Sequence, residues 1–73
     1  MSGDRISEQF GRNLAEARGW IGMTQEQLAR KTGIQQSQVA RLENGERHPS
    51  LDRIVTLAEA VGVQVRDLLY GIE

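Results

Sequence analysis

The spacing of apolar side chains divides the chain into helical segments. Between residues 5 and 21, apolar residues recur three and four positions apart, which places them on one face of an α-helix. The members of this face are Ile6, Phe10, Leu14, Ala17 and Ile21. Gly22 follows, at the position where a left-handed residue commonly ends a helix. The pattern therefore predicts a first helix over residues 5–21.

Two short segments come next. Thr24 and Gln27 have the spacing of a capping box at the start of the first, which is expected over residues 25–32. The second, expected over residues 36–43, has an apolar pair facing inward and an otherwise polar surface. A helix of this length is not stable in isolation. Both segments must therefore be held by packing against the rest of the chain.

Residues 51–61 and 65–70 complete the pattern. The first of these segments follows Ser50, a residue type that favours the N-cap position. Its expected inner face consists of Leu51, Ile54, Leu57, Ala58 and Val61. The second segment is short and apolar. The sequence therefore predicts an all-α protein with five helices, organised as a single domain over residues 1–73.

Composition narrows the class of function. The chain has no cysteine and one histidine, so neither a metal nor a cofactor is expected. No nucleophile stands with an acid/base pair, so an enzyme is not expected. The formal net charge is −1, so a basic patch for nucleic acid must be local. No apolar run approaches the roughly 20 residues of a membrane span, and no signal peptide is visible. The expected compartment is the cytoplasm, without membrane association.

The two short segments and the glycine turn between them are typical of a helix-turn-helix, over about residues 24–45. The polar surface of the second segment is suited to the major groove of DNA. That groove admits a helix and presents a distinct set of donors and acceptors for each base pair. Double-stranded DNA is therefore the expected partner, and no small-molecule ligand is expected.

Residues 24–45, with the sequence TQEQLARKTGIQQSQVARLENG, resemble the helix-turn-helix of the Cro/C1 family. This family includes phage repressors, restriction-modification controller proteins and many antitoxins. The similarity continues through residues 47–51 and 57–62 and covers residues 5–70 in outline. It implies a compact five-helix domain like that of the lambda repressor, a role in transcription, and a bacterial or phage origin.

The resemblance also implies contacts with DNA. It assigns base reading to Gln35, Gln36, Ser37 and Arg41, and contacts with the DNA backbone to Gln25, Gln38, Asn44 and Arg47. The chemistry agrees, because glutamine can bond N6 and N7 of adenine and arginine can bond O6 and N7 of guanine. Arg12 and Asn13 are weaker candidates for phosphate contacts.

The sequence departs from the family pattern at Gln35 and Gln64. These positions usually carry Ser, Thr or Asp as an N-cap, and glutamine is a poor cap. The starts of both helices are therefore left open, and Gln35 is alternatively an extra DNA contact.

Other residues have a structural interpretation. The resemblance implies a partly buried ion pair between Arg18 and Glu43. Val65, Leu69 and Ile72 recur at helical spacing, apart from the expected core, and are predicted to form the interface of a homodimer. The alternative is that the tail folds back over the first helix near Trp20, which either marks a partner surface or packs over its neighbouring glycine.

These observations favour a sequence-specific DNA-binding regulator that acts as a homodimer on an inverted repeat. Repression by occlusion and activation through RNA polymerase both remain open. Two alternatives remain as well: an antitoxin that binds a toxin protein and regulates its own synthesis, and a protein-interaction module without DNA binding, which the slight overall acidity would fit.

Overall fold

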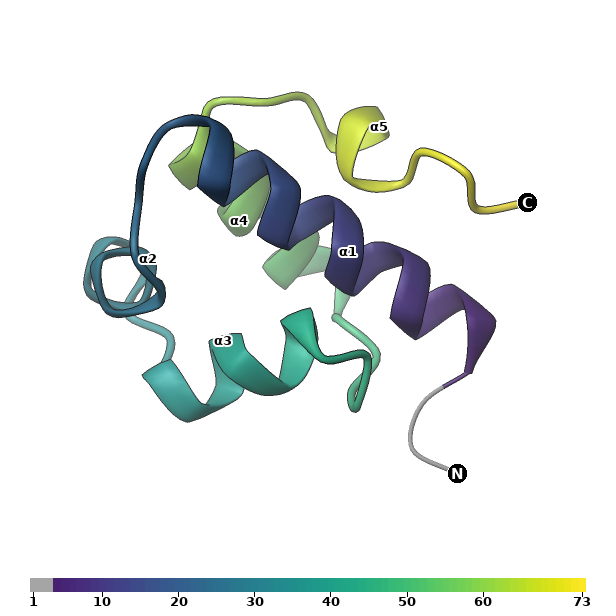
Figure 1. Ribbon diagram of the computed structural model, residues 1–73, viewed down its shortest axis with the longest axis horizontal. Coiled ribbons are helices and arrows are strands. Elements are labelled where there is room, and N and C mark those ends of the chain that lie inside the picture. The colour runs from purple at the N-terminus through teal and green to yellow at the C-terminus, as the bar shows by residue number, and fades with distance from the viewer. Residues whose placement is uncertain (1–3) are drawn as a thin grey trace.

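The structure is a computed structural model that describes residues 4–73. Within these residues the chain forms five α-helices and no β-strand: α1 (Arg5–Trp20), α2 (Gln25–Thr32), α3 (Gln36–Glu43), α4 (Leu51–Val61) and α5 (Val65–Leu68). Figure 1 shows α1 crossing the molecule, with α4 behind it and α3 and α5 on opposite sides of it. The all-α fold with five helices is confirmed. The predicted domain also includes residues 1–3, which lie outside the described residues.

Short polar side chains mark where three of the helices begin. Each accepts a hydrogen bond from a backbone N–H of the first turn, which satisfies a donor that the helix itself cannot pair. These caps are Asp4 to Ser7 at 2.8 Å, Thr24 to Gln27 at 3.0 Å and Ser50 to Arg53 at 3.1 Å. The side chain of Gln35 makes no capping bond at the start of α3. At α5 the cap is reversed, since the Asp67 carboxylate accepts from the backbone N–H of Gln64 at 2.9 Å.

Every helix contributes to one apolar core. The largest fully buried apolar side chains are Phe10, Leu14, Leu28, Val39, Leu57, Val61 and Leu68. Burial of such a side chain contributes roughly 1.5–3 kcal/mol relative to its exposure. Because α2 and α3 place Leu28 and Val39 in this core, packing holds the two short helices in position.

Three residues expected on inner faces are exposed, and those expectations are wrong. Ile6, Ile21 and Leu51 have 49%, 52% and 81% of their surface accessible. Ile6 and Leu51 lie in the first turns of their helices, and Ile21 is the C-cap that follows α1. Periodicity assigns a side of a helix, but it does not show how far along the helix the core extends.

Helix α1 passes very close to the end of α3 at Gly11. A Cβ atom at this position would lie 2.6 Å from the carbonyl oxygen of Leu42 and would also meet the carbonyl oxygen of Glu43. Next to this crossing, Gly45 has a φ of +77°, and a Cβ there would lie 2.9 Å from the Cα of Glu8. The C-terminal end of α3 is therefore anchored against the first half of α1.

The chain after α5 turns back along α1. The amide of Asn13 donates to the carbonyl oxygens of Leu68 and Tyr70, each at 2.8 Å. Because α5 ends at Leu68 rather than at residue 70, no helical stripe continues to Ile72, which instead packs partly buried against the core. The expected continuous stripe is therefore wrong. The tail lies on α1, as in the alternative, but residues 71–73 line a hollow with the first half of α1, and only Tyr70 lines one with Trp20. None of the helices in the described residues is long and apolar enough to span a membrane.

Candidate nucleic-acid interface

Helix α3 presents a polar face to solvent. Gln36, Ser37 and Arg41 are exposed along it, and Gln35 is exposed at its N-cap. Ser37 and Arg41 are four residues apart and therefore share one face of the helix. The opposite side of α3 is buried in the core. Ser37 and Arg41 thus share the free side of a helix that is fixed from behind, and Gln35 and Gln36 are exposed at its start.

The residues predicted to contact the DNA backbone flank this face. Gln38 is half-buried, whereas Asn44 and Arg47 are exposed. Gln38 and Arg47 line a hollow of about 240 Å³ between the end of α3 and the start of α4, together with Arg53. Sequence reasoning missed Arg53, because it lies in α4, outside the helix-turn-helix. Its charge was the only signal, and only the fold shows that it lies beside Arg47.

His48 lines the same hollow but also contacts the start of α1. Its Nε2 atom lies 2.7 Å from Oδ2 of Asp4. The pKa of the Asp4 carboxyl is lowered, chiefly because it accepts the backbone N–H of Ser7, with a further contribution from His48. This contact ties the loop after α3 to the N-terminus of α1.

Arg18 joins α1 to the end of α3. Its Nε donates to Oε2 of Glu43 at 2.6 Å, and a terminal nitrogen donates to Oε1 at 2.9 Å. The other terminal nitrogen donates to the carbonyl oxygen of Met23 at 2.8 Å. The Glu43 side chain is only 5% exposed, and the hydrogen bond with it raises the pKa of Arg18. A two-pronged, charge-assisted contact of this kind fixes orientation as well as distance.

Gln25, the first residue of α2, also contacts the ion pair between Arg18 and Glu43. Its side-chain nitrogen donates to Oε1 of Glu43 at 2.9 Å. The side chain is therefore turned toward the ion pair between Arg18 and Glu43. Its backbone N–H lies in the first turn of α2, where N–H groups have no partner within the helix and attract an anion. A phosphate contact through the backbone is thus better supported than one through the side chain.

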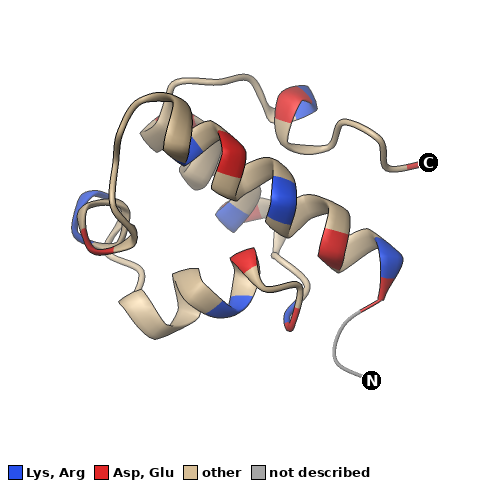
Figure 2. Cartoon of the chain, viewed as in Figure 1, with Lys and Arg blue, Asp and Glu red and all other residues tan. Residues whose placement is uncertain are grey.

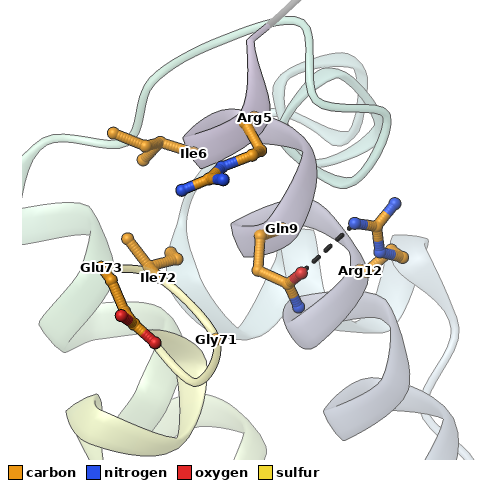
Figure 3. A pocket seen from close by; sticks show the side chains of 7 residues that line it. All are labelled: Arg5, Ile6, Gln9, Arg12, Gly71, Ile72 and Glu73. Carbon is orange, nitrogen blue, oxygen red and sulfur yellow. Dashed lines mark hydrogen bonds between the residues drawn. The ribbon is translucent and has the colours of Figure 1, made fainter.

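The two α1 residues considered for phosphate contacts, Arg12 and Asn13, differ in their exposure. Arg12 is exposed and donates to Oε1 of Gln9 at 3.2 Å, as Figure 3 shows. Asn13 is 8% exposed, and its amide is used by the two carbonyl oxygens of the tail. The expected phosphate contact of Asn13 is therefore wrong, because the side chain holds the C-terminal tail.

The residues predicted to form the dimer interface lie in a different region of the molecule. Val65 and Leu69 are each 37% exposed, and Ile72 is half-buried. Ile72 and Ile6 line a hollow of about 390 Å³ between the tail and the first half of α1 (Figure 3). This region is separate from the polar face of α3, because Figure 1 places α5 on the far side of α1.

Charge is unevenly distributed over α3. Figure 2 shows that the first turns of α3 carry no charge, and that a basic and an acidic position follow near its end. The basic residue is Arg41, and the acidic residue is Glu43, which Arg18 neutralises. Arg47 and Arg53 lie beyond this end. The first turns of α3 are therefore neutral and polar, and the positive charges of Arg41, Arg47 and Arg53 lie at and beyond its end.

Residues 14–68 match the model of a helix-turn-helix family, HTH_3. The chain belongs to this family. It is similar to the control protein C.BamHI of Bacillus amyloliquefaciens, with 36% identity over 61 residues, or 82% of this chain and 75% of that protein. An uncharacterised HTH-type transcriptional regulator of Archaeoglobus fulgidus is 36% identical over 55 residues, covering 75% of this chain and 79% of that protein.

Solved structures of helix-turn-helix proteins agree with the fold. The restriction-modification controller protein C.AhdI of Aeromonas hydrophila has a TM-score of 0.82 and 39% identity, covering 85% of this chain and 94% of that one. The clp gene regulator ClgR of C. glutamicum has a TM-score of 0.86 and 26% identity, covering 90% of this chain and 86% of that one.

Membership in this helix-turn-helix family confirms the interpretation as a DNA-binding transcriptional regulator of the Cro/C1 type, a class of proteins that are not enzymes. The family match begins at Leu14 and ends at Leu68, so it includes α2, α3 and the hollow beside Arg47. The roles of the individual side chains in DNA binding stay predictions, as does the dimer.

Proposed function

We propose that this protein binds an inverted repeat in duplex DNA as a homodimer, with α3 of each protomer in the major groove of one half-site. The exposed polar face of α3 carries this proposal. A helix whose far side is buried and whose end is fixed by Arg18 and Glu43 presents its side chains in a defined geometry. Such preorganisation is what discrimination between base pairs requires.

Each group of exposed residues has a distinct part in the proposed complex. Arg41 binds the edge of a guanine and Gln36 binds the edge of an adenine, with Gln35 and Ser37 beside them. Arg47, Gln38 and Asn44 position the domain on phosphates, together with the backbone at Gln25. The arrangement of Arg53 beside Arg47 supports a further phosphate contact from the start of α4. Phosphate contacts supply affinity, and base contacts supply specificity.

The dimer interface is proposed on four aliphatic side chains of α1, α5 and the tail. Val65 and Leu69 are its centre, with Ile72 and Ile6 at the adjoining hollow. A two-fold axis would pair this surface with itself and carry the two α3 helices on the DNA side. Half-sites about one helical turn apart follow from this geometry.

The named functions of two relatives support a role in gene control. C.BamHI and C.AhdI are named as control and controller proteins. On the basis of this similarity, we propose that the protein acts in the cytoplasm and binds operators that lie near promoters. It represses where it occludes the promoter, and it activates where it lies beside RNA polymerase. A reporter gene with the operator placed over or upstream of the promoter separates the two effects.

Selection of bound sequences from a pool of random duplexes tests the proposal. The expected result is a palindromic consensus, with two chains on each selected duplex in sedimentation. Recovery of sequences without a consensus would contradict specific reading, and a consensus with a single half-site would contradict the dimer. Arg47→Ala serves as a control, since it should weaken binding to all duplexes alike and reduce the dependence on salt.

A further inference from the structure

Two of the three aromatic residues line one hollow at the surface. Phe10 is buried in the core, whereas Trp20 is 89% exposed and Tyr70 is 77% exposed. Both of these side chains line a hollow of about 250 Å³ between the second half of α1 and the α5 region. Trp20 also lines a second, more open hollow beside Gly19. Large exposed aromatic side chains are typical of the central residues of protein interfaces.

The floor and one wall of the first hollow are fixed by contacts with the rest of the domain. Ala17 and Val63 line it and pack against the core. Asn13 donates to the carbonyl oxygen of Tyr70 at 2.8 Å, which holds the tail against α1. The floor of the hollow is therefore preformed, and only the exposed side chains around it are ordered when it is occupied.

The charges at this hollow have one sign. The charged residues that line it are Glu16 on α1 and Asp67 on α5, and both are acidic. Carboxylates attract a cation, and the faces of tryptophan and tyrosine rings attract it as well. The apolar floor is complementary to an aliphatic side chain next to that cation. The lining residues thus select a basic group with apolar neighbours.

We propose that this aromatic–acidic hollow (Glu16, Ala17, Trp20, Val63, Asp67 and Tyr70) docks a segment of a partner protein that presents a lysine or arginine beside apolar side chains. The cation lies between the carboxylates and the aromatic rings, and the apolar side chains cover the floor. Figure 1 places α5 and α3 on opposite sides of α1, so the partner and DNA can be bound together. This docking site is additional to the proposed DNA binding and does not depend on it.

Fluorescence of the only tryptophan reports binding at the hollow itself. The probe is a short amphipathic peptide with leucine and arginine on one helical face. Its matched control carries citrulline, which has the shape of arginine without the charge. We expect a saturable change in Trp20 emission, with roughly tenfold weaker binding of the citrulline peptide. Equal binding of the two peptides, or no saturable change, would overturn the proposal.

Two variants locate the binding site. Glu16→Gln and Tyr70→Ala should each weaken binding of the arginine peptide several-fold. Glu59→Gln removes the same charge from α4 outside the hollow and should leave the affinity for the peptide unchanged. Circular dichroism checks folding, and affinity for the selected duplex should stay unchanged in all three variants. Equal weakening by Glu59→Gln would show attraction to overall charge only. Loss of a dimer in Tyr70→Ala would show that a second copy of this chain occupies the hollow, and either result rejects the proposal.

Discussion

The Glu43 carboxylate joins three helices. It accepts hydrogen bonds from Arg18 of α1 and Gln25 of α2, and it is itself the last residue of α3. A carboxylate this deeply buried needs a partner, because an unpaired buried charge is strongly unfavourable. The sequence predicted the pair only through family resemblance, since two charges 25 positions apart carry no local signal. The part played by Gln25 was not visible at all.

Arg18→Met should therefore lower the free energy of unfolding by about 3 kcal/mol, since it leaves the Glu43 carboxylate without its main partner. Denaturant unfolding measures this change. Glu46→Gln, at an exposed position in the following loop, is a matched control and should change stability by less than about 0.5 kcal/mol. A double-mutant cycle of Arg18→Met with Glu43→Gln should give a large coupling energy. Coupling below about 1 kcal/mol would place the pair among ordinary surface ion pairs.

Arg41 is the side chain whose removal should change specificity. Arg41→Ala should cost about 1–3 kcal/mol at one guanine of each half-site and relax the preference there. Repeating the duplex selection with this variant measures the effect position by position. Arg47→Ala should instead leave the consensus unchanged and lower affinity throughout. If Arg41→Ala selects the same consensus as the unmodified protein, the assignment of the reading face is wrong.

The helices could be predicted closely, because their ends are marked by local chemistry. Capping side chains and glycines mark the bounds of α2 and α4 in the sequence. The start of α3 has no such mark, because Gln35 makes no capping bond, yet the structure has the predicted bounds for all three helices. Helix α5 is shorter than predicted because Asn13, 55 positions before Leu68, draws the following chain onto α1. Contacts at such a separation leave no periodic pattern. Gly11 was likewise invisible, since a glycine within a helix does not show which element passes over it.

The crossing at Gly11 gives a prediction with a built-in control. Alanine favours a helix over glycine by about 1 kcal/mol, yet Gly11→Ala should lower stability by about 1–3 kcal/mol, because its Cβ would meet the end of α3. Gly19 lies in the same helix with nothing within 4 Å of a Cβ, so Gly19→Ala should raise stability. Thermal unfolding of both variants compares them directly. An increase in melting temperature for both would show that α1 and α3 are not in close contact.

The proposed functions fall on two sides of the molecule, and the sequence distinguished these sides incompletely. The polar face of α3 followed from the motif, since polarity on one side of a short helix is a local pattern. Spacing also predicted the apolar residues Val65, Leu69 and Ile72, but it missed Ile6, which was expected to be buried and is exposed beside Ile72. Where the chain folds back decides which apolar residues are left in solvent. The centre of the proposed dimer interface therefore comes from the spacing of residues, and the adjoining hollow comes from the fold.

Leu69→Glu should abolish the proposed dimer, because it places a charge at the centre of an apolar contact. The variant should stay folded by circular dichroism, sediment as a monomer and lose most of its affinity for the palindrome. Ile21→Glu is the matched control, with the same charge on an exposed apolar residue at the end of α1, and should remain a dimer. A monomeric Ile21→Glu beside a dimeric Leu69→Glu would move the interface to the region of Trp20.

Competition between duplexes tests the central claim, which is specific reading of DNA by α3. The selected palindrome is labelled and displaced by the unlabelled palindrome or by a shuffled duplex of the same composition, at fixed salt. If α3 reads base pairs, the palindrome should bind at least about a thousandfold more tightly than the shuffled duplex. Arg41→Ala should then narrow this ratio of affinities. Equal displacement by the two duplexes would rule out specific reading, because it would show binding to the DNA backbone alone.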